Sequence, residues 1–124
     1  MKILIGNTFP LALVRRRVSI APIRVEDARI LIDDSEGMAS FWGHTNTASA
    51  AEAALGVPVS PKTERPALVL DSEGLPSLDG ESYGTVLVLS PDYAPGFRPA
   101  IGAEIPAEAI LGWQALLLQW EERA

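Results

Sequence analysis

The residues best suited to chemistry in this sequence form a short polar turn around its single histidine. Gly43 and His44 open the turn, and Thr45, Asn46 and Thr47 complete it before an alanine-rich segment. Imidazole is the side chain whose ordinary pKa lies nearest neutrality, so His44 can donate or accept a proton. A helix that begins here would present unpaired backbone N–H groups to an anion, and a glycine lets the backbone approach a ligand closely. The turn therefore indicates a phosphate site that includes a proton donor.

A second polar pair, Asn7 and Thr8, directly follows a short apolar run at 2–6. In layered α/β folds, ligands collect beyond the carboxyl ends of strands, so this pair is a second ligand-binding candidate. A plainer interpretation stays open at both places. Asparagine forms turns, threonine caps helices, and the histidine can be an ordinary loop residue.

Arginines supply most of the positive charge, since eight of the ten basic residues are Arg. Arginine is the better group for bidentate phosphate contacts. The run Arg15–Arg17 is a candidate phosphate clamp, with a solvated face as the alternative. Arg65 and Arg98 are isolated cations near expected strand ends. Arg98 stands beside Tyr93 and Phe97, where a base could stack on the rings, although a rigid surface loop explains the same residues.

Composition sets limits on the chemistry. The chain has 124 residues, 48% of them hydrophobic, with no Cys and one His, which predicts one compact domain over 1–124. Without cysteine there is no disulfide, thiolate zinc site, iron–sulfur cluster or cysteine nucleophile, and one histidine excludes a His-rich zinc site. Only a carboxylate metal site stays open. The net charge of −6 argues against broad binding to duplex nucleic acid, although residues 1–30 carry six basic against two acidic side chains.

No targeting or membrane segment is expected. The apolar start is interrupted by Asn7, Thr8 and Pro10, and its arginines follow the apolar stretch rather than precede it. No run approaches the roughly 20 apolar residues of a membrane-spanning helix. We expect a cytoplasmic protein, or one in the host cytoplasm if a virus encodes it.

The elements that must position these residues follow from periodicity, β-branched content and turn residues. Strands are expected at 2–6, 18–25, 38–42, 65–70 and 84–89. Helices are expected at 10–14 (capped by Thr8), 26–32 and 48–55. Irregular loops are expected at 71–83 and 90–102, and residues 106–124 fit a helix or a strand. Pro22 suggests an edge strand or a bulge, and Thr85–Leu89 suits a central strand. The sum is an α/β domain of about five strands with two or three helices.

These residues, in this order, resemble a known family. The matching positions are Asn7, Thr8 and Phe9; Gly43, His44, Thr47 and Ala48; Leu55, Gly56 and Val57; and Arg65 before a strand. The sequence is similar, over most of residues 1–90, to the small viral anti-CRISPR ring nucleases that act on type III CRISPR signalling and to their bacterial relatives.

The resemblance implies a homodimer with a mixed β-sheet that binds cyclic tetra-adenylate and cleaves it without a metal or any other cofactor. A ribose 2′-hydroxyl attacks the adjacent phosphorus, and the family's histidine, matched here by His44, protonates the leaving 5′-oxygen. The products are linear di-adenylates that end in a 2′,3′-cyclic phosphate. The expected ligand-binding residues are Asn7, Thr8, Gly43, Thr45, Asn46, Thr47, Arg65 and Arg98.

The sequence departs from the family at two places. Pro10 stands where the family commonly has a polar residue that touches the ligand. The segment 90–98 stands where many members have Gln and Arg and then Glu, and Arg98 could replace that Arg from another position. Two other classes of function therefore stay open: a module that binds or sequesters a cyclic nucleotide without cleaving it, and an interaction protein that docks through its acidic surface.

Overall fold

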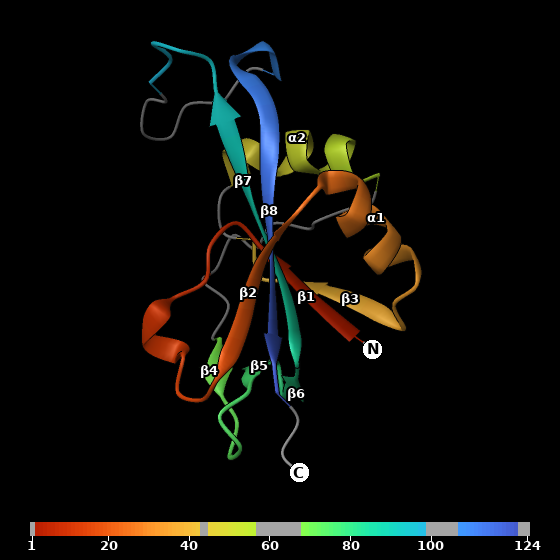
Figure 1. The fold of residues 1–124 in the computed structure, drawn as a ribbon, viewed down its shortest axis with the longest axis vertical. Coiled ribbons are helices and arrows are strands. Elements are labelled where there is room, and N and C mark those ends of the chain that lie inside the picture. Colours follow the sequence, from red (N-terminus) through yellow and green to blue (C-terminus); the bar gives the residue numbers. More distant parts are fainter. Residues whose placement is uncertain (1, 43–44, 57–67, 99–106, 122–124) are drawn as a thin grey trace.

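The computed structural model describes residues 2–42, 45–56, 68–98 and 107–121. A mixed five-stranded sheet forms the centre, two α-helices cover one face, and a three-stranded sheet lies at one end (Figure 1). The strands of the main sheet, in spatial order, are β2 (Val18–Ile23), β8 (Ile110–Trp120), β7 (Thr85–Tyr93), β1 (Lys2–Gly6) and β3 (Gly37–Ser40). The small sheet contains β4 (Val69–Leu70), β5 (Pro76–Leu78) and β6 (Glu81–Ser82). The helices are α1 (Val25–Asp33), α2 (Thr45–Leu55) and the 3₁₀ turns η1 (Leu11–Leu13) and η2 (Ala107–Ala109). The expected α/β class is confirmed.

The direction of the strands decides where polar residues meet. β1 runs parallel to both β3 and β7, whereas β8 pairs antiparallel with β7 and with β2. The carboxyl ends of β1 and β3 therefore lie at the same edge of the sheet, and β7 runs on past that edge. β2 is an edge strand, as Pro22 indicated, because an edge tolerates a residue without a backbone donor.

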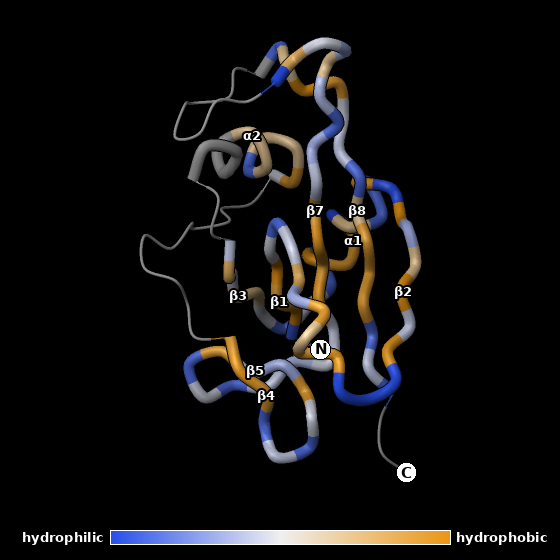
Figure 2. The backbone as a smooth tube through the Cα atoms, turned by 90° about the vertical axis from the view of Figure 1, so that its left-hand side faces the viewer, coloured by the Kyte–Doolittle hydropathy of each residue, from blue (hydrophilic) through white to orange (hydrophobic). Residues whose placement is uncertain are grey.

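Each face of the sheet has its own apolar core, because side chains alternate along a strand. Ile3 and Ile5 of β1 pack toward the helices, while Leu4 between them packs with Val86 and Val88 of β7 on the opposite face. Figure 2 shows hydrophobic residues concentrated along the middle of β1, β7 and β8. Burial on both faces explains why the central strands have continuous apolar sequences.

Each of the two helices buries residues that are four positions apart in sequence and therefore lie on one helix face. In α2, Ala51 and Leu55 stand four residues apart and are buried against the sheet, and the helix ends at Gly56, whose φ of +74° suits glycine. In α1, Ala28 and Ile32 have the same spacing and are buried on the same side of the sheet.

Four expectations are corrected. Residues 71–83 are not simply an exposed loop, because they contain β5 and β6, and all three residues of β5 are buried. Residues 90–102 are not irregular throughout, because β7 continues to Tyr93. The N-cap position of η1 is Pro10, and no side chain donates or accepts a capping hydrogen bond there, so Thr8 does not cap this turn. α2 begins at Thr45 rather than at residue 48.

The ambiguous C-terminal segment is a strand. β8 runs over eleven residues between β7 and β2, and the alternation of its buried side chains follows from its two neighbours. On the helix side, the ring of Trp113 lies 6.3 Å from that of Trp42, and on the other face Trp120 is buried. Of the strand expected at 65–70, Val69 and Leu70 form β4, and residues 65–67 lie outside the described part.

Candidate functional site

The carboxyl ends of β1 and β3 lie side by side. The backbone N–H of Phe41 donates to the carbonyl of Ile5 at 2.9 Å, which extends the parallel pairing beyond the end of β3. The ring of Phe41 covers Gly6 so closely that a Cβ at position 6 would lie 2.3 Å from its Cζ. Phe9 then packs edge-on against Phe41, with ring centroids 6.3 Å apart. The polar pair after β1 is thereby held at the end of β3.

A pocket of about 230 Å³ opens at this edge, on the face of the sheet opposite the helices. Its polar lining residues are Asn7, Thr8 and Ser90. Its apolar lining residues are Phe9, Leu11, Val14, Ile20, Val88, Leu116 and Leu118. Ligand pockets commonly combine an apolar wall with a few polar groups that fix orientation, and this pocket has that composition.

The histidine turn is only partly described. Gly43 and His44 lie outside the described residues, so the expected general acid is neither placed nor excluded. Thr45, Asn46 and Thr47 form the first turn of α2, although their side chains lie outside what the structure describes. The expectation that a helix starts at this turn is correct, and such a start presents unpaired backbone N–H groups.

Of the two expected cations, the structure places only Arg98, and not in the pocket. Arg65 lies outside the described residues. Arg98 is exposed, follows the turn after Tyr93 and is not among the residues that line the pocket. The rings of Tyr93 and Phe97 pack on each other, with centroids 5.5 Å apart, so each covers part of the surface on which a base could stack.

The three residues of the run Arg15–Arg17 have different environments. Arg15 and Arg17 are exposed. Arg16 donates to the backbone carbonyl of Glu73 at 3.1 Å and also to that of Glu121. One guanidinium thus ties the loop before β2 to the β4–β5 hairpin and to the end of β8, a structural role.

Ser90 is a pocket residue that sequence reasoning missed. It stands where the continuous apolar run Thr85–Leu89 ends, and that transition to a polar residue was the available signal. The residues after Ser90 are rich in proline and glycine and predict a loop, so this signal does not stand out in the sequence. In the structure the strand continues, and Ser90 faces the same side as Val88.

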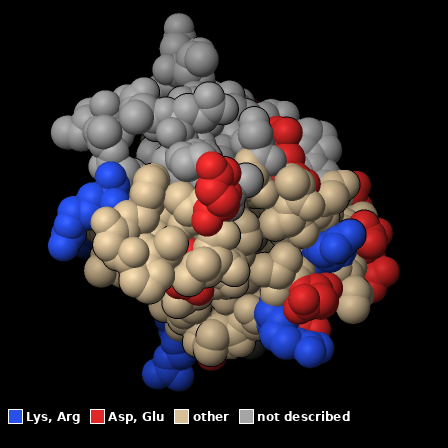
Figure 3. Space-filling view, turned by 90° about the horizontal axis from the view of Figure 1, so that it is seen from above, with Lys and Arg blue, Asp and Glu red and all other residues tan. Residues whose placement is uncertain are grey.

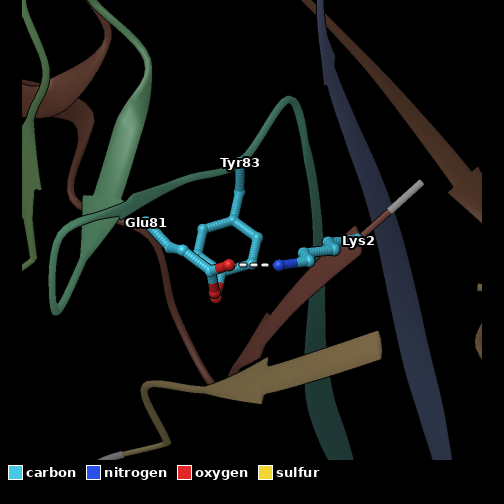
Figure 4. Close-up of polar contacts among 3 residues, drawn as sticks. All are labelled: Lys2, Glu81 and Tyr83. Atoms are coloured by element: carbon cyan, nitrogen blue, oxygen red, sulfur yellow. Dashed lines mark hydrogen bonds and ion pairs between the residues drawn. The ribbon is translucent and has the colours of Figure 1, made fainter. Parts of the chain in front are cut away.

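At the opposite end of the sheet, a cluster of Lys2, Glu81 and Tyr83 has shifted pKa values (Figure 4). The hydrogen bond and ion pair with Glu81 raise the pKa of Lys2, and the same contact, with the Tyr83 hydroxyl, lowers the pKa of Glu81. Burial, and then the neighbouring Glu81, raise the pKa of Tyr83. The cluster ties β6 and the start of β7 to the amino end of β1, so we assign it to folding.

Two further features concern metals and membranes. In the part of the chain that the structure describes, no three His, Cys, Asp or Glu side chains gather as a metal site would require. Among the described helices, none has the length and apolar character needed to cross a membrane.

Charge on the molecule is mixed. Figure 3 shows acidic and basic side chains interspersed on the described part of the surface seen from above. Broad duplex binding needs a continuous basic surface, and none is visible on that part of this face.

Comparison with known proteins gives one informative result. No protein-family model matches the sequence, and no curated protein matches it. Among solved structures, the chain matches B116 of Sulfolobus turreted icosahedral virus with a TM-score of 0.61 and 14% sequence identity, over 97% of this chain and 100% of that chain. At this identity the likeness concerns the fold alone: the described chain is similar, along nearly its whole length, to a small protein of an archaeal virus.

Proposed function

We propose that this protein is a metal-independent ring nuclease that binds cyclic tetra-adenylate and cleaves it to linear di-adenylates ending in a 2′,3′-cyclic phosphate. One observation carries the proposal. The parallel pairing of β1 and β3 brings the Asn7–Thr8 pair to the edge of the sheet at which β3 ends and after which the histidine turn and α2 follow. Those two polar segments carried the resemblance to ring nucleases, and a shared edge is what one active site made from both requires.

The chemistry needs no group beyond those of the chain and the ligand. A bond forms between the ribose 2′-oxygen and phosphorus while the bond from phosphorus to the 5′-oxygen breaks. His44 gives its proton to the departing 5′-oxygen, and the proton of the 2′-hydroxyl passes to solvent. Proton donation of this kind contributes about 10²–10⁴-fold, and in-line positioning of the hydroxyl supplies much of the rest.

The pocket supplies the positioning. Asn7, Thr8 and Ser90 offer amide and hydroxyl groups for ribose and phosphate oxygens in the pocket. By this proposal, the amino end of α2, which follows β3 in the chain and is not among the residues that line the pocket, offers backbone N–H groups to a phosphate at the same edge of the sheet. Arg65 and Arg98 remain the proposed cations. By this proposal the protein switches off type III CRISPR signalling by removing its cyclic messenger. The fold that the chain shares with a viral protein agrees with such a role.

The proposal includes a homodimer. Three of the large apolar side chains that are exposed in the described part of the chain, Leu11, Ile20 and Leu116, line this one pocket, with exposures of 81%, 53% and 38%. Contiguous exposed apolar groups mark interaction surfaces. A second copy that covers them would enclose a ring-shaped ligand between two equivalent pockets.

The test is chromatography of labelled cyclic tetra-adenylate after incubation with the protein in EDTA. Wild type should release di-adenylate, and His44→Ala should lose nearly all of this activity while binding the ring. Ser90→Ala should weaken binding, whereas Ser72→Ala, an exposed serine of the β4–β5 hairpin, should change neither binding nor rate. An intact ring with wild type at high enzyme concentration would refute the nuclease.

A second candidate, a module that binds the cyclic nucleotide without cleaving it, is favoured by one observation. Where many members of the family have Gln and Arg and then Glu, the end of β7 in this chain has Ser90, Pro91 and Asp92. Tight binding of the ring by wild type without product, unchanged in His44→Ala, would identify this second function.

A further inference from the structure

β7 and β8 continue together beyond the end of β1 as a two-stranded ribbon (Figure 1). Polar residues of this ribbon lie next to the pocket that Val88, Ser90 and Leu116 line. Val88 and Leu116 are paired across the ribbon, and both line the pocket. The next pair whose side chains point to the same face is Ser90 and Gln114, because side chains alternate along each strand. Gln114 therefore lies beside Ser90 on the same face of the ribbon, next to the residues that line the pocket but not among them.

The spacing suits one nucleotide. Gly6 pairs with Val88, so Asn7 and Thr8 leave β1 close to the level of Ser90, with which they share the pocket. Neighbouring strands lie about 4.8 Å apart, so the polar positions extend about 10 Å across the sheet from β1 to Gln114. A nucleotide held by its ribose and phosphate at the β1 end can reach β8 with its base.

A neighbouring carboxylate fixes the orientation of the Gln114 amide. Its Nε2 donates to Oδ1 of Asp92 at 3.0 Å. An ionised carboxylate only accepts hydrogen bonds, so the amide nitrogen, and not the amide oxygen, must face Asp92. When the N–H that points away from the carbonyl oxygen donates to Asp92, the carbonyl oxygen and the second N–H stand side by side, as one acceptor and one donor in a fixed order.

That donor and acceptor complement an adenine. Adenine presents an exocyclic amine that donates next to a ring nitrogen that accepts, and glutamine binds such an edge with two hydrogen bonds. A base with a carbonyl in place of the amine, such as hypoxanthine, presents an acceptor where adenine presents this donor. The negative charge of Asp92 also opposes a phosphate at this place, so the ribbon suits the base and not the backbone of the ligand.

We propose that Gln114, oriented by Asp92, is a specificity-determining residue that recognises an adenine base of the ligand at the β7–β8 ribbon. The inference rests on the proposed function, since it names the residue that selects the base for the same site. Glutamine at this position is an ordinary exposed strand residue in sequence, and only the register beside Ser90 gives it this role.

The experiment compares two rings, cyclic tetra-adenylate and cyclic tetra-inosinate, in binding and in cleavage. Wild type should prefer the adenine ring by about 5- to 150-fold, the discrimination of one bidentate contact to a base. Gln114→Leu should lower the affinity for the adenine ring more than the affinity for the inosine ring, so that the two affinities become nearly equal. Asp92→Asn should reduce the preference, because an amide partner also accepts the reversed orientation of Gln114.

Gln119→Leu is the matched control, since Gln119 is an exposed glutamine at the far end of the same strand, and it should keep the wild-type preference. If Gln114→Leu keeps that preference while wild type binds the adenine ring, this inference is overturned and the proposed function stands. If wild type binds neither ring, the proposed function fails and the inference fails with it.

Discussion

At position 6 the sheet has no room for a side chain. The ring of Phe41, itself buried, occupies the space where a Cβ would lie. We predict that Gly6→Ala destabilises the protein by about 1–3 kcal/mol, the usual cost of forcing an extra carbon into a packed site. Gly37→Ala is the control, because nothing lies within 4 Å of a Cβ at that strand position. Urea unfolding measures both, and equal stability of the two variants would contradict the packing described here.

The Lys2–Glu81 pair predicts how stability changes with pH. The pKa of Glu81 is lowered by folding, so its contribution is present above the ordinary carboxyl pKa and is lost as pH falls through the lowered value. The pKa of Lys2 is raised, so its contribution is present below the ordinary pKa of 10.5 and is lost as pH rises through the raised value.

Glu81→Gln should therefore lower stability slightly at neutral pH and remove part of the loss seen on acidification. The effect should be small because both side chains are exposed to solvent. Glu108→Gln, an exposed carboxylate at the other end of the molecule, should leave the acid limb of the stability profile unchanged. Thermal unfolding from pH 3 to 7 makes the comparison, and parallel profiles for wild type and Glu81→Gln would exclude this role.

Individual pocket residues differ in how well their sequence reveals them. Asn7 and Thr8 could be predicted because a polar pair after a buried strand marks the carboxyl edge of a sheet. Ser90 and Gln114 could not, because their meeting depends on the pairing of β7 with β8, which neither local sequence contains. Arg98 is a candidate in sequence because of its charge, its neighbours Tyr93 and Phe97 and the family resemblance, but it is not among the residues that line the pocket.

Among the elements, β7 has two different environments along its length. From Val86 to Val88 it lies between β1 and β8, whereas its last residues, up to Tyr93, have only β8 as a partner. We predict that hydrogen exchange of backbone amides is slow over Val86–Val88 and markedly faster over Ser90–Tyr93, because local opening of a two-stranded ribbon costs less. Uniform protection along all of β7 would show that the ribbon is covered on its open side.

Some elements can be predicted from local sequence, whereas others depend on the strands with which they pair. The buried strand β1 and the alanine-rich helix α2 follow from local pattern alone. The segment that forms β8 fits a helix as well as a strand, and its two neighbouring strands decide the outcome. β5 and β6 are equally hidden in sequence, because the glycines and acids in and around them indicate turns. The burial of Leu78 in β5 comes from the core on the face opposite the helices.

For the whole molecule, the arrangement of exposed apolar groups predicts assembly. Ile20 and Leu116 lie on the face of the sheet that the helices leave open, beside the proposed ligand pocket, whereas Ile30 is exposed on α1, which covers the opposite face. If a second copy covers the pocket face, a buried charge there is costly, and the same charge on α1 is not.

We therefore predict that wild type sediments as a dimer. Ile20→Asp and Leu116→Asp should each raise the dissociation constant of the dimer at least tenfold, so that these variants sediment as monomers. Ile30→Asp should remain a dimer. Circular dichroism must show that all three variants are folded, so that the shift reports assembly. Because each pocket would need the other copy to enclose a ring, the two monomeric variants should also lose affinity for cyclic tetra-adenylate. A wild-type monomer that binds the ring with full affinity would separate the pocket from assembly and place the whole ligand site within one chain.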